Sequence, residues 1–252
     1  MGKIALYCGR SMVAFKFARR MLDENPERVA FVEFADAESA VVYNLAASLG
    51  IPTFNFTTEA DSIDRIRVHG VTTALLLWWP KIVHEINNIG INVLNTHPSY
   101  LPYNRGKYPY YWAIVTPSPF GATIHRVDSG IDTGAILWQK EVEVTPLDTG
   151  ETLHKKSIDA TSELLDEHYH SIVAEEFPLG IEQDETKATS HLAKDLDRDE
   201  LLELEDYEHV GWLIKDLRAR TFDNRQSGRR VKIDGKFYRI QLRLTEDTSE
   251  GC

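Results

Sequence analysis

The uninterrupted apolar run Ala74–Trp79 is the feature that most constrains the fold of this chain. A strand with one solvated face alternates apolar and polar residues, whereas a strand covered on both faces is apolar throughout. The run therefore predicts a strand in the middle of a sheet. Strands of this kind belong mainly to parallel sheets with helices on both faces. The sequence thus favours the α/β class.

The first half of the chain repeats this pattern of strands followed by helices. Short apolar segments predict strands at Ile4–Tyr7, Val29–Phe34 and Val93–Thr96. Apolar residues at helical spacing predict helices at Ala14–Leu22 and Ser39–Leu49. Alternation of this kind implies a parallel sheet with right-handed crossovers.

The second half of the chain has a different pattern. Two strands are predicted at Gly121–Val127 and Ile136–Val144, with a turn-rich stretch between them. A long helix is predicted over Thr149–Phe177, and Asp148–Glu151 resembles a capping box at its start. Antiparallel strands followed by a long helix indicate that the sheet is not purely parallel.

The C-terminal part of the chain is predicted to be smaller and separate. Residues 182–200 are polar and acidic, which indicates a linker or an exposed segment, and residues 201–220 have helical spacing. Asp234-Gly235 between alternating runs predicts a β-hairpin. We therefore place a boundary near residue 185, between a first domain at 1–185 and a C-terminal region at 186–252.

Composition excludes several classes of protein. The 252 residues are 42% hydrophobic and 27% charged, as in soluble globular proteins, and no stretch approaches the roughly 20 apolar residues of a membrane span. The N-terminus runs directly into a predicted strand, which argues against a signal peptide. Cys8 and Cys252 have no metal-ligand spacing, which favours a reducing, cytoplasmic location. A net charge of -11 argues against RNA or DNA as partner but leaves a small anionic ligand open.

The segment Asn95–Pro102 carries the strongest chemical signal. It follows a predicted strand, and open α/β sheets bind ligands beyond the carboxyl ends of their strands. Asn95 and His97 are two residues apart, so both point to one face of that strand. An amide can stabilise a developing oxyanion, and an imidazole can move a proton near neutral pH. The pair suits acyl transfer, although a structural histidine beside a turn-forming asparagine would give the same pattern.

Asp132 is the second candidate for chemistry. It lies in the turn after the strand Gly121–Val127. A carboxylate near His97 would orient the ring and favour its charged form. The alternative is that an aspartate between glycines only forms the turn. The chain contains neither a Gly-x-Ser-x-Gly nor a His-Glu-x-x-His motif, and we expect Cys8 to belong to the core.

Three stretches together resemble the formyltransferases that use N10-formyltetrahydrofolate. They are Asn95-x-His97-Pro-Ser-x-Leu-Pro, Arg105-Gly106-x-x-Pro109 followed by Trp112-Ala-Ile, and His125-x-x-Asp128-x-Gly130-Ile-Asp132-Thr-Gly. The resemblance covers roughly residues 70–178. It implies a Rossmann-like core with a mixed, mostly parallel sheet, and a small C-terminal region with a helix and a hairpin. It also implies that Asn95, His97 and Asp132 form the catalytic triad. Tyr100 departs from the second Leu of many relatives, which should alter packing more than chemistry.

Three branches of this family compete. Glycinamide ribonucleotide formyltransferases are shorter and usually lack the stretch that stands here at 105–114. Methionyl-tRNA formyltransferases add a basic C-terminal domain, whereas this chain is acidic and has only a short tail. Nucleotide-sugar N-formyltransferases, such as those acting on dTDP-4-amino-4,6-dideoxyglucose for surface polysaccharide (O-antigen) synthesis, fit best. A folate- or nucleotide-binding module without activity remains the alternative from another class.

The resemblance also implies binding residues for two ligands, and no metal. For N10-formyltetrahydrofolate they are Trp78, Trp79, Pro80, Lys81, Ile82, His125, Asp128 and Gly130. For the nucleotide sugar they are Ser11, Arg105, Gly106, Lys107, Tyr108, Arg220, Phe222 and Asn224. One of the two tryptophans is expected to be core. Finally, the family resemblance and the apolar residues of the hairpin predict a homodimer joined through residues 186–252.

Overall fold

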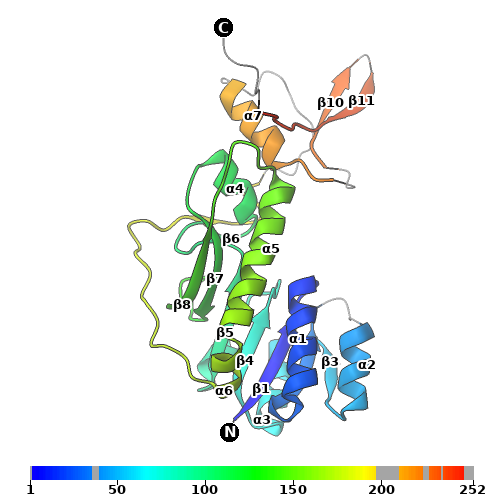
Figure 1. Cartoon of the computed structure of the whole chain (residues 1–252), viewed down its shortest axis with the longest axis vertical. Coiled ribbons are helices and arrows are strands. Elements are labelled where there is room, and N and C mark those ends of the chain that lie inside the picture. Colours follow the sequence, from blue (N-terminus) through cyan, green and yellow to red (C-terminus); the bar gives the residue numbers. More distant parts are fainter. Residues whose placement is uncertain (1, 36–39, 197–209, 224–226, 234, 247–252) are drawn as a thin grey trace.

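The computed structural model describes residues 2–35, 40–196, 210–223, 227–233 and 235–246 (Figure 1). Its centre is one seven-stranded sheet with the order β3-β2-β1-β4-β5-β7-β8. The first five of these strands in that order run parallel, and β7 and β8 are each antiparallel to their neighbour. The bounds are β1 Lys3–Cys8, β2 Val29–Phe34, β3 Thr53–Asn55, β4 Val71–Leu77, β5 Asn92–His97, β7 Phe120–Arg126 and β8 Ile136–Val142. The predicted mixed, mostly parallel sheet is confirmed.

Helices cover both faces of the sheet. One face packs against α1, α2, α5 and α6, and the opposite face packs against α3 and the short 3-10 helix η2. The bounds are α1 Met12–Glu24, α2 Ala40–Ser48, α3 Glu59–Val68, η2 Ile86–Asn88, α5 Gly150–Glu167 and α6 Tyr169–Ala174. A further 3-10 turn, η1, spans Pro26–Arg28, and α4, which lies beyond β6, spans Pro109–Val115.

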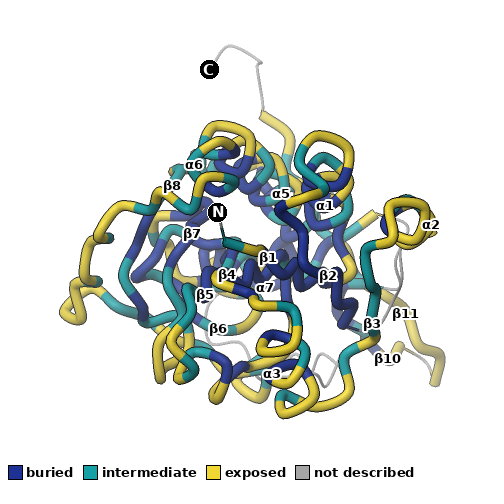
Figure 2. The backbone as a smooth tube through the Cα atoms, turned by 90° about the horizontal axis from the view of Figure 1, so that it is seen from below, coloured by how far each residue is buried: buried dark blue, intermediate teal, exposed yellow. Residues whose placement is uncertain are grey.

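The central strands are apolar because both of their faces are buried. Along β1, Leu6 and Cys8 belong to the cluster under α1, whereas Ala5 and Tyr7 belong to the cluster on the opposite face. All four side chains are fully buried, and Figure 2 shows the middle strands in the buried colour. The predicted core position of Cys8 is confirmed, and burial raises the pKa of its thiol far above its usual range.

Two predicted boundaries are wrong, and both have a local cause. The strand predicted to reach Trp79 ends at Leu77, because Trp78 adopts a left-handed backbone conformation with φ 54°. The helix predicted over residues 149–177 is broken at His168, which caps the C-terminus of α5 before α6 begins. At its start, the capping box joins Thr149 and Thr152 instead of Asp148 and Glu151.

Residues 176–189 form an extended strap that leaves α6 and returns along the outside of the sheet (Figure 1). Early in the strap, Ile181 pairs with Ile136 through two backbone hydrogen bonds of 2.8 Å. At its end, β9 (Ser190–His191) pairs in parallel with β6 (Arg105–Gly106). The segment predicted as a linker or an exposed segment therefore pairs with residues of the first domain, and the predicted boundary near residue 185 falls inside the strap.

The C-terminal unit consists of α7 (Val210–Ala219) and the hairpin of β10 (Arg229–Ile233) and β11 (Lys236–Ile240). The predicted hairpin is confirmed, with Ile233 paired to Lys236. Residues 201–209 of the predicted helix, together with Asp234, lie outside the described residues. None of the helices in the described ranges is long and apolar enough to cross a membrane.

Asp216 joins this unit to α4. Its side chain is fully buried and accepts hydrogen bonds from the Tyr111 hydroxyl (2.6 Å), Arg220 Nε (2.8 Å) and Arg229 Nε (2.8 Å). Burial on its own raises the pKa of Asp216, but these donors hold it below its usual value. The carboxylate is therefore charged at neutral pH, and it ties α4, α7 and β10 together.

Candidate active site

A cavity of about 440 Å³ lies at the carboxyl ends of β4 and β5. Its walls come from the loop after β4, the end of β5, the residues after β6, the loop between β7 and β8, the N-terminal part of α5, and residues 191–193 beyond the strap. The volume is that of a typical small-molecule site. The position is where open α/β sheets bind their ligands, as the sequence predicted.

Two neighbouring strands bring polar side chains to one side of this cavity. Asn95 and His97 both line it from β5, as their spacing predicted. The antiparallel register places His125 of β7 directly opposite Asn95. Asn95 Nδ2 lies 3.2 Å from His125 Nε2, and the His125 Nδ1–H donates to the Arg126 carbonyl at 2.7 Å. Because Nδ1 carries the proton, Nε2 is free to accept from Asn95.

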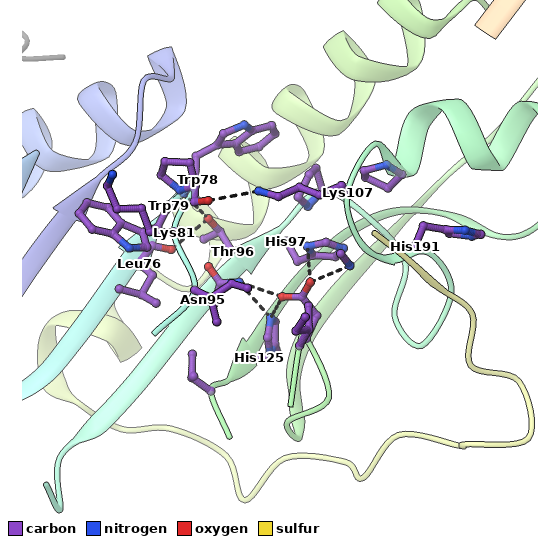
Figure 3. Close-up of a pocket in the computed structure, with 18 of the residues that line it drawn as sticks. Leu76, Trp78, Trp79, Lys81, Asn95, Thr96, His97, Lys107, His125 and His191 are labelled. Carbon is purple, nitrogen blue, oxygen red and sulfur yellow. Dashed lines mark hydrogen bonds and ion pairs between the residues drawn. The ribbon is translucent and has the colours of Figure 1, made fainter. Parts of the chain in front are cut away.

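Figure 3 shows Asn95, His97 and His125 lying close together at the cavity. Asp132 completes this cluster from the loop between β7 and β8. Its Oδ2 accepts the Gly106 N–H at 2.9 Å and lies 3.4 Å from His97 Nδ1. Its Oδ1 accepts from Asn95 Nδ2 at 3.3 Å and lies 3.5 Å from His125 Nε2. The structure thus brings Asn95, His97 and Asp132 together, with His125 as a fourth member. Asp132 itself has a left-handed backbone with φ 54°, a conformation that aspartate tolerates better than most residues.

The hydrogen bonds of His97 define which nitrogen can take up a proton. Nε2 lies 3.1 Å from the Asn104 carbonyl, which can only accept, so Nε2 carries a hydrogen. Nδ1 is then bare in the neutral ring. Its 3.4 Å separation from Asp132 Oδ2 is longer than the roughly 2.7–2.9 Å of a charge-assisted hydrogen bond. Nδ1 is therefore the basic atom of the cluster, and a carboxylate lies beside it.

The protonation states follow from burial and from the neighbouring charges. Burial lowers the pKa of His97, which is only 5% exposed, although Asp132 acts in the opposite direction. Burial on its own raises the pKa of Asp132, but His97, His125 and the Gly106 N–H hold it well below its usual range. At neutral pH the cluster therefore holds a charged carboxylate beside a neutral imidazole.

Aromatic residues and one lysine form the remaining walls. Trp79 packs edge-on against Tyr7 and belongs to the core, whereas Trp78 is half-buried and packs edge-on near His154. The Lys107 ammonium donates to the Pro80 carbonyl at 3.2 Å, so it spans two walls. Within the described ranges, no three His, Cys, Asp or Glu side chains are arranged to hold a metal ion.

The predicted binding residues divide into two groups. All eight residues predicted for the cofactor line the cavity, as do Gly106, Lys107 and Tyr108 from the substrate set. Four others from that set lie outside the lining: Ser11, Arg105, Arg220 and Phe222. Asn224 is outside the described residues.

Each of these four residues makes a contact within the protein that explains its position outside the cavity lining. Ser11 caps α1 by accepting the Val13 N–H. The Arg105 guanidinium binds the side chains of Gln183 and Glu185. Arg220 is bound to Asp216, and Phe222 packs edge-on against Tyr110 with ring centres 5.5 Å apart. Because Tyr110 lines the cavity, Phe222 lies one ring away from it.

Sequence reasoning missed several wall residues of this cavity, among them Tyr110, His154 and His191. Tyr110 stands two residues before Trp112 of the recognised stretch, and this proximity was a usable signal. His191 lies in the polar segment predicted as a linker, and it stacks on Trp112 with ring centres 4.0 Å apart. Only the pairing of β9 with β6 brings His191 to the site.

Comparison with known proteins agrees with this geometry. The family model for formyl transferases matches residues 36–168, which include the whole Asn95, His97, His125 and Asp132 cluster. The chain belongs to the formyl transferase family.

The relatives of this formyltransferase include proteins that act on sugars. It is 29% identical over 155 residues to the dTDP-4-amino-4,6-dideoxyglucose formyltransferase of Mycobacterium bovis, covering 61% of this chain and 65% of that protein. Its fold matches a likely sugar N-formyltransferase from Mycobacterium tuberculosis with a TM-score of 0.80 and 21% identity, over 98% of this chain and 100% of the other.

A third comparison concerns a structure with bound ligands. A formyltransferase from Anoxybacillus kamchatkensis, in complex with UDP-4,6-dideoxy-4-formamido-L-AltNAc and tetrahydrofolate, is 28% identical with a TM-score of 0.55. The match covers 77% of this chain and 87% of that chain.

Proposed function

We propose that this formyltransferase moves a formyl group from N10-formyltetrahydrofolate to the amine of a dTDP-linked amino dideoxy sugar. The observation that carries the proposal is the meeting of an amide, a neutral imidazole and a charged carboxylate at one wall of the cavity. These groups are what acyl transfer to an amine requires. The Mycobacterium bovis relative, named for a dTDP-amino sugar, supports the choice of acceptor.

The cavity fits a folate-type formyl donor. Its walls are largely aromatic and aliphatic, with Trp78, Trp79 and Ile82 on one side, which suits a flat heteroaromatic ring. Trp79 Nε1 is buried and has no hydrogen-bond partner among the described residues. A ligand acceptor would satisfy it. The donor supplies the activated formyl group, and the protein supplies the proton transfers and the charge stabilisation.

His97 is the proposed base in this reaction. An amine attacks a formyl carbon only in its neutral form, so its proton must be removed. Neutral His97 can take that proton, and Asp132 then stabilises the imidazolium that forms. The same proton can pass from His97 to the leaving nitrogen. A positioned acid–base group contributes about 10²–10⁴-fold in rate.

Asn95 is the proposed partner of the negatively charged oxygen that develops at the formyl carbon. Both of its N–H groups are engaged, with Asp132 and His125, at 3.3 Å and 3.2 Å. These contacts are long, and catalytic hydrogen bonds commonly tighten only when the substrate is bound. We expect one N–H of Asn95 to turn toward the formyl oxygen.

The acceptor is proposed to enter past Lys107 and Tyr108. Lys107 offers a positive charge for the diphosphate, and Phe222 remains the proposed stacking partner of the base, beyond Tyr110. Arg105 and Arg220 already bind carboxylates, so we assign them to packing.

A turnover assay tests the proposal. The purified protein is incubated with N10-formyltetrahydrofolate and, in separate reactions, dTDP-amino sugars, UDP-amino sugars, glycinamide ribonucleotide and Met-tRNA. We expect rapid formylation of a dTDP-amino dideoxy sugar and none of Met-tRNA, because the chain has a net charge of -11. Comparable rates with Met-tRNA or glycinamide ribonucleotide would contradict the choice of acceptor. No turnover with any acceptor would favour a binding module.

We further propose a homodimer that is joined through the C-terminal unit, in the cytoplasm. Trp212, Ile233, Phe237 and Tyr238 are each at least 45% exposed on α7 and the hairpin. The hairpin is a separate two-stranded sheet with exposed edges, which a second copy would cover. Light scattering at micromolar concentration tests this, and a monomer mass would remove it.

A further inference from the structure

Asp132 is held in place at both its side chain and its main chain. Its carboxylate accepts the Gly106 N–H, and its carbonyl accepts from Gln183 Nε2 at 2.9 Å. The second hydrogen of the same Gln183 amide goes to the Gly134 carbonyl at 2.7 Å. Gln183 belongs to the strap, fifty-one residues further along the chain than Asp132.

The oxygen of the Gln183 amide is also hydrogen-bonded. This Oε1 accepts from Arg105 Nε (3.0 Å) and Nη2 (2.9 Å), and the same guanidinium binds Glu185. Arg105 is buried and directly precedes Gly106, the residue whose N–H holds the Asp132 carboxylate. The four hydrogen-bonding positions of one amide group therefore link the 128–134 loop to β6.

The backbone of the loop explains why such a link is needed. Asp132 has a φ of 54°, in the left-handed region that costs energy for a residue with a side chain. A loop in this state persists only when surrounding contacts determine it. If it relaxed, the carboxylate would leave His97 Nδ1, which is already 3.4 Å away.

Glutamine is well suited to this position. Two carbonyl acceptors and one guanidinium require a group with two donors and an acceptor on one plane, which only an amide offers. Glutamate would place a negative charge against two carbonyl oxygens. The Ile181–Ile136 pairing and the bond from Arg105 N to the Thr189 carbonyl fix the strap on either side of Gln183.

We propose that Gln183 is a positioning residue, which holds the 128–134 loop so that the Asp132 carboxylate faces His97. The consequence for turnover rests on the proposed formyl transfer, whereas the positioning itself does not. Gln183 lies outside the cavity lining, so it acts through Asp132 and not on the substrate.

Steady-state kinetics of two variants test the proposal. Gln183→Met is uncharged and similar in length, and it removes every hydrogen bond of the amide. Gln183→Glu keeps the acceptors for Arg105 and removes the donors to the loop. We expect both to lower kcat about 10- to 100-fold, as a displacement of about 1 Å can, with KM changed less than about threefold. Glu182→Gln, an exposed neighbour in the strap, is the matched control and should leave kcat unchanged.

An NMR titration of His97 in the absence of substrates measures the pKa of His97. This pKa would not change if Gln183 had only a structural role. Burial lowers the pKa of His97, Asp132 and the Asn104 carbonyl raise it, and His125 and Lys107 lower it further. Only the contact with Asp132 should change in Gln183→Met. We therefore expect the pKa of His97 to fall in Gln183→Met, toward its value in Asp132→Asn.

Each outcome supports or overturns the positioning role. An unchanged pKa of His97 in Gln183→Met overturns it, even if kcat falls, because the loss would then arise elsewhere. Wild-type kcat in Gln183→Glu also overturns it. If the wild type transfers no formyl group at all, the proposed function fails, and the titration alone still decides the role of Gln183.

Discussion

Asp132 and Asp216 are two buried carboxylates in different regions of the molecule, and both stay charged for the same reason. Burial would raise the pKa of either group, and hydrogen bonds and neighbouring basic side chains lower it. Asp132 lies in a loop at the edge of the cavity. Asp216 lies on α7, between the C-terminal unit and the catalytic half, and is not part of the cavity lining.

The difference between them lies in their partners. Asp216 is bound by Arg220, Arg229 and Tyr111, whose protonation does not change near neutral pH. Asp132 is bound by a backbone N–H and an amide and faces the imidazoles of His97 and His125. Imidazole is the side-chain group whose ordinary proton exchange falls nearest neutral pH. A buried charged acid is thus not a functional site by itself. Titratable partners beside a cavity distinguish the candidate active site around Asp132 from the structural junction around Asp216.

The largest expected effect comes from the catalytic region. His97→Ala and Asp132→Asn should each lower kcat about 10²–10⁴-fold, the contribution of a positioned acid–base group. Far-UV circular dichroism should show a normal fold for both. A variant that keeps more than about a tenth of wild-type kcat would contradict the roles proposed for these residues.

The matching change in the structural region should have the opposite phenotype. Asp216→Asn leaves the buried Arg229 and the partly buried Arg220 without their carboxylate, and breaking a buried ion pair typically costs about 3–5 kcal/mol. Urea unfolding should show this loss in the free energy of unfolding, while kcat per folded molecule changes less than about tenfold. A kcat loss as large as that of Asp132→Asn would remove the distinction between the two regions.

The comparison of wild type with Asp216→Asn also predicts how the free energy of unfolding depends on pH. The folded-state pKa of Asp216 is below its unfolded value of about 3.9. Its stabilising contribution is therefore complete above about pH 5, and is lost as the pH falls through the folded pKa. The stability gap between wild type and Asp216→Asn should be constant from about pH 5 to 8 and narrow at pH 3. A gap of equal size at pH 3 would show that the charge is not what stabilises the junction.

Phe222 tests whether the C-terminal unit also binds substrate. Phe222→Ala should raise KM for the sugar nucleotide if the Phe222 ring stacks on the base. The loss of binding free energy should be about 1–3 kcal/mol, with a smaller effect on kcat. Because the ring also packs against Tyr110 and beside Gly150, stability must be measured in parallel. An unchanged KM would place the base elsewhere on the protein.

Ser11 gives the smallest expected effect. It caps α1 and lies outside the cavity lining, so Ser11→Ala should cost about 1 kcal/mol of stability and leave KM unchanged. Thermal unfolding and initial rates suffice to measure both. A raised KM would return Ser11 to the substrate site that the sequence predicted for it.

The sequence alone located six of the seven strands of the central sheet, all except β3, and it named three of the four residues of the cluster. Runs of apolar residues located these strands. The side chains of a central strand must fill both faces of the sheet, as Leu6 and Tyr7 do on opposite faces. The spacing of Asn95 and His97 placed both on one side of β5, and the family resemblance supplied Asp132.

The features that the sequence did not predict depend on tertiary contacts. The left-handed turn at Trp78 leaves no local signal in a run of apolar residues. His125 was assigned to the cofactor, yet the register of β7 against β5 places it within hydrogen-bond reach of Asn95. Gln183 lies in a polar stretch, and only the return of the strap along the sheet gives its amide four partners.

The strap also bears on the order in which this protein becomes active during synthesis. The seven strands are complete once β8 ends at Val142, and the helices on the sheet end at Ala174. Proteins fold from the N-terminus as they emerge, so the sheet and its helices can leave the ribosome before Gln183 and His191 do. We expect such a nascent chain to be compact but inactive. The contacts that hold the Asp132 loop therefore form last, on a sheet whose strands and helices all come earlier in the chain.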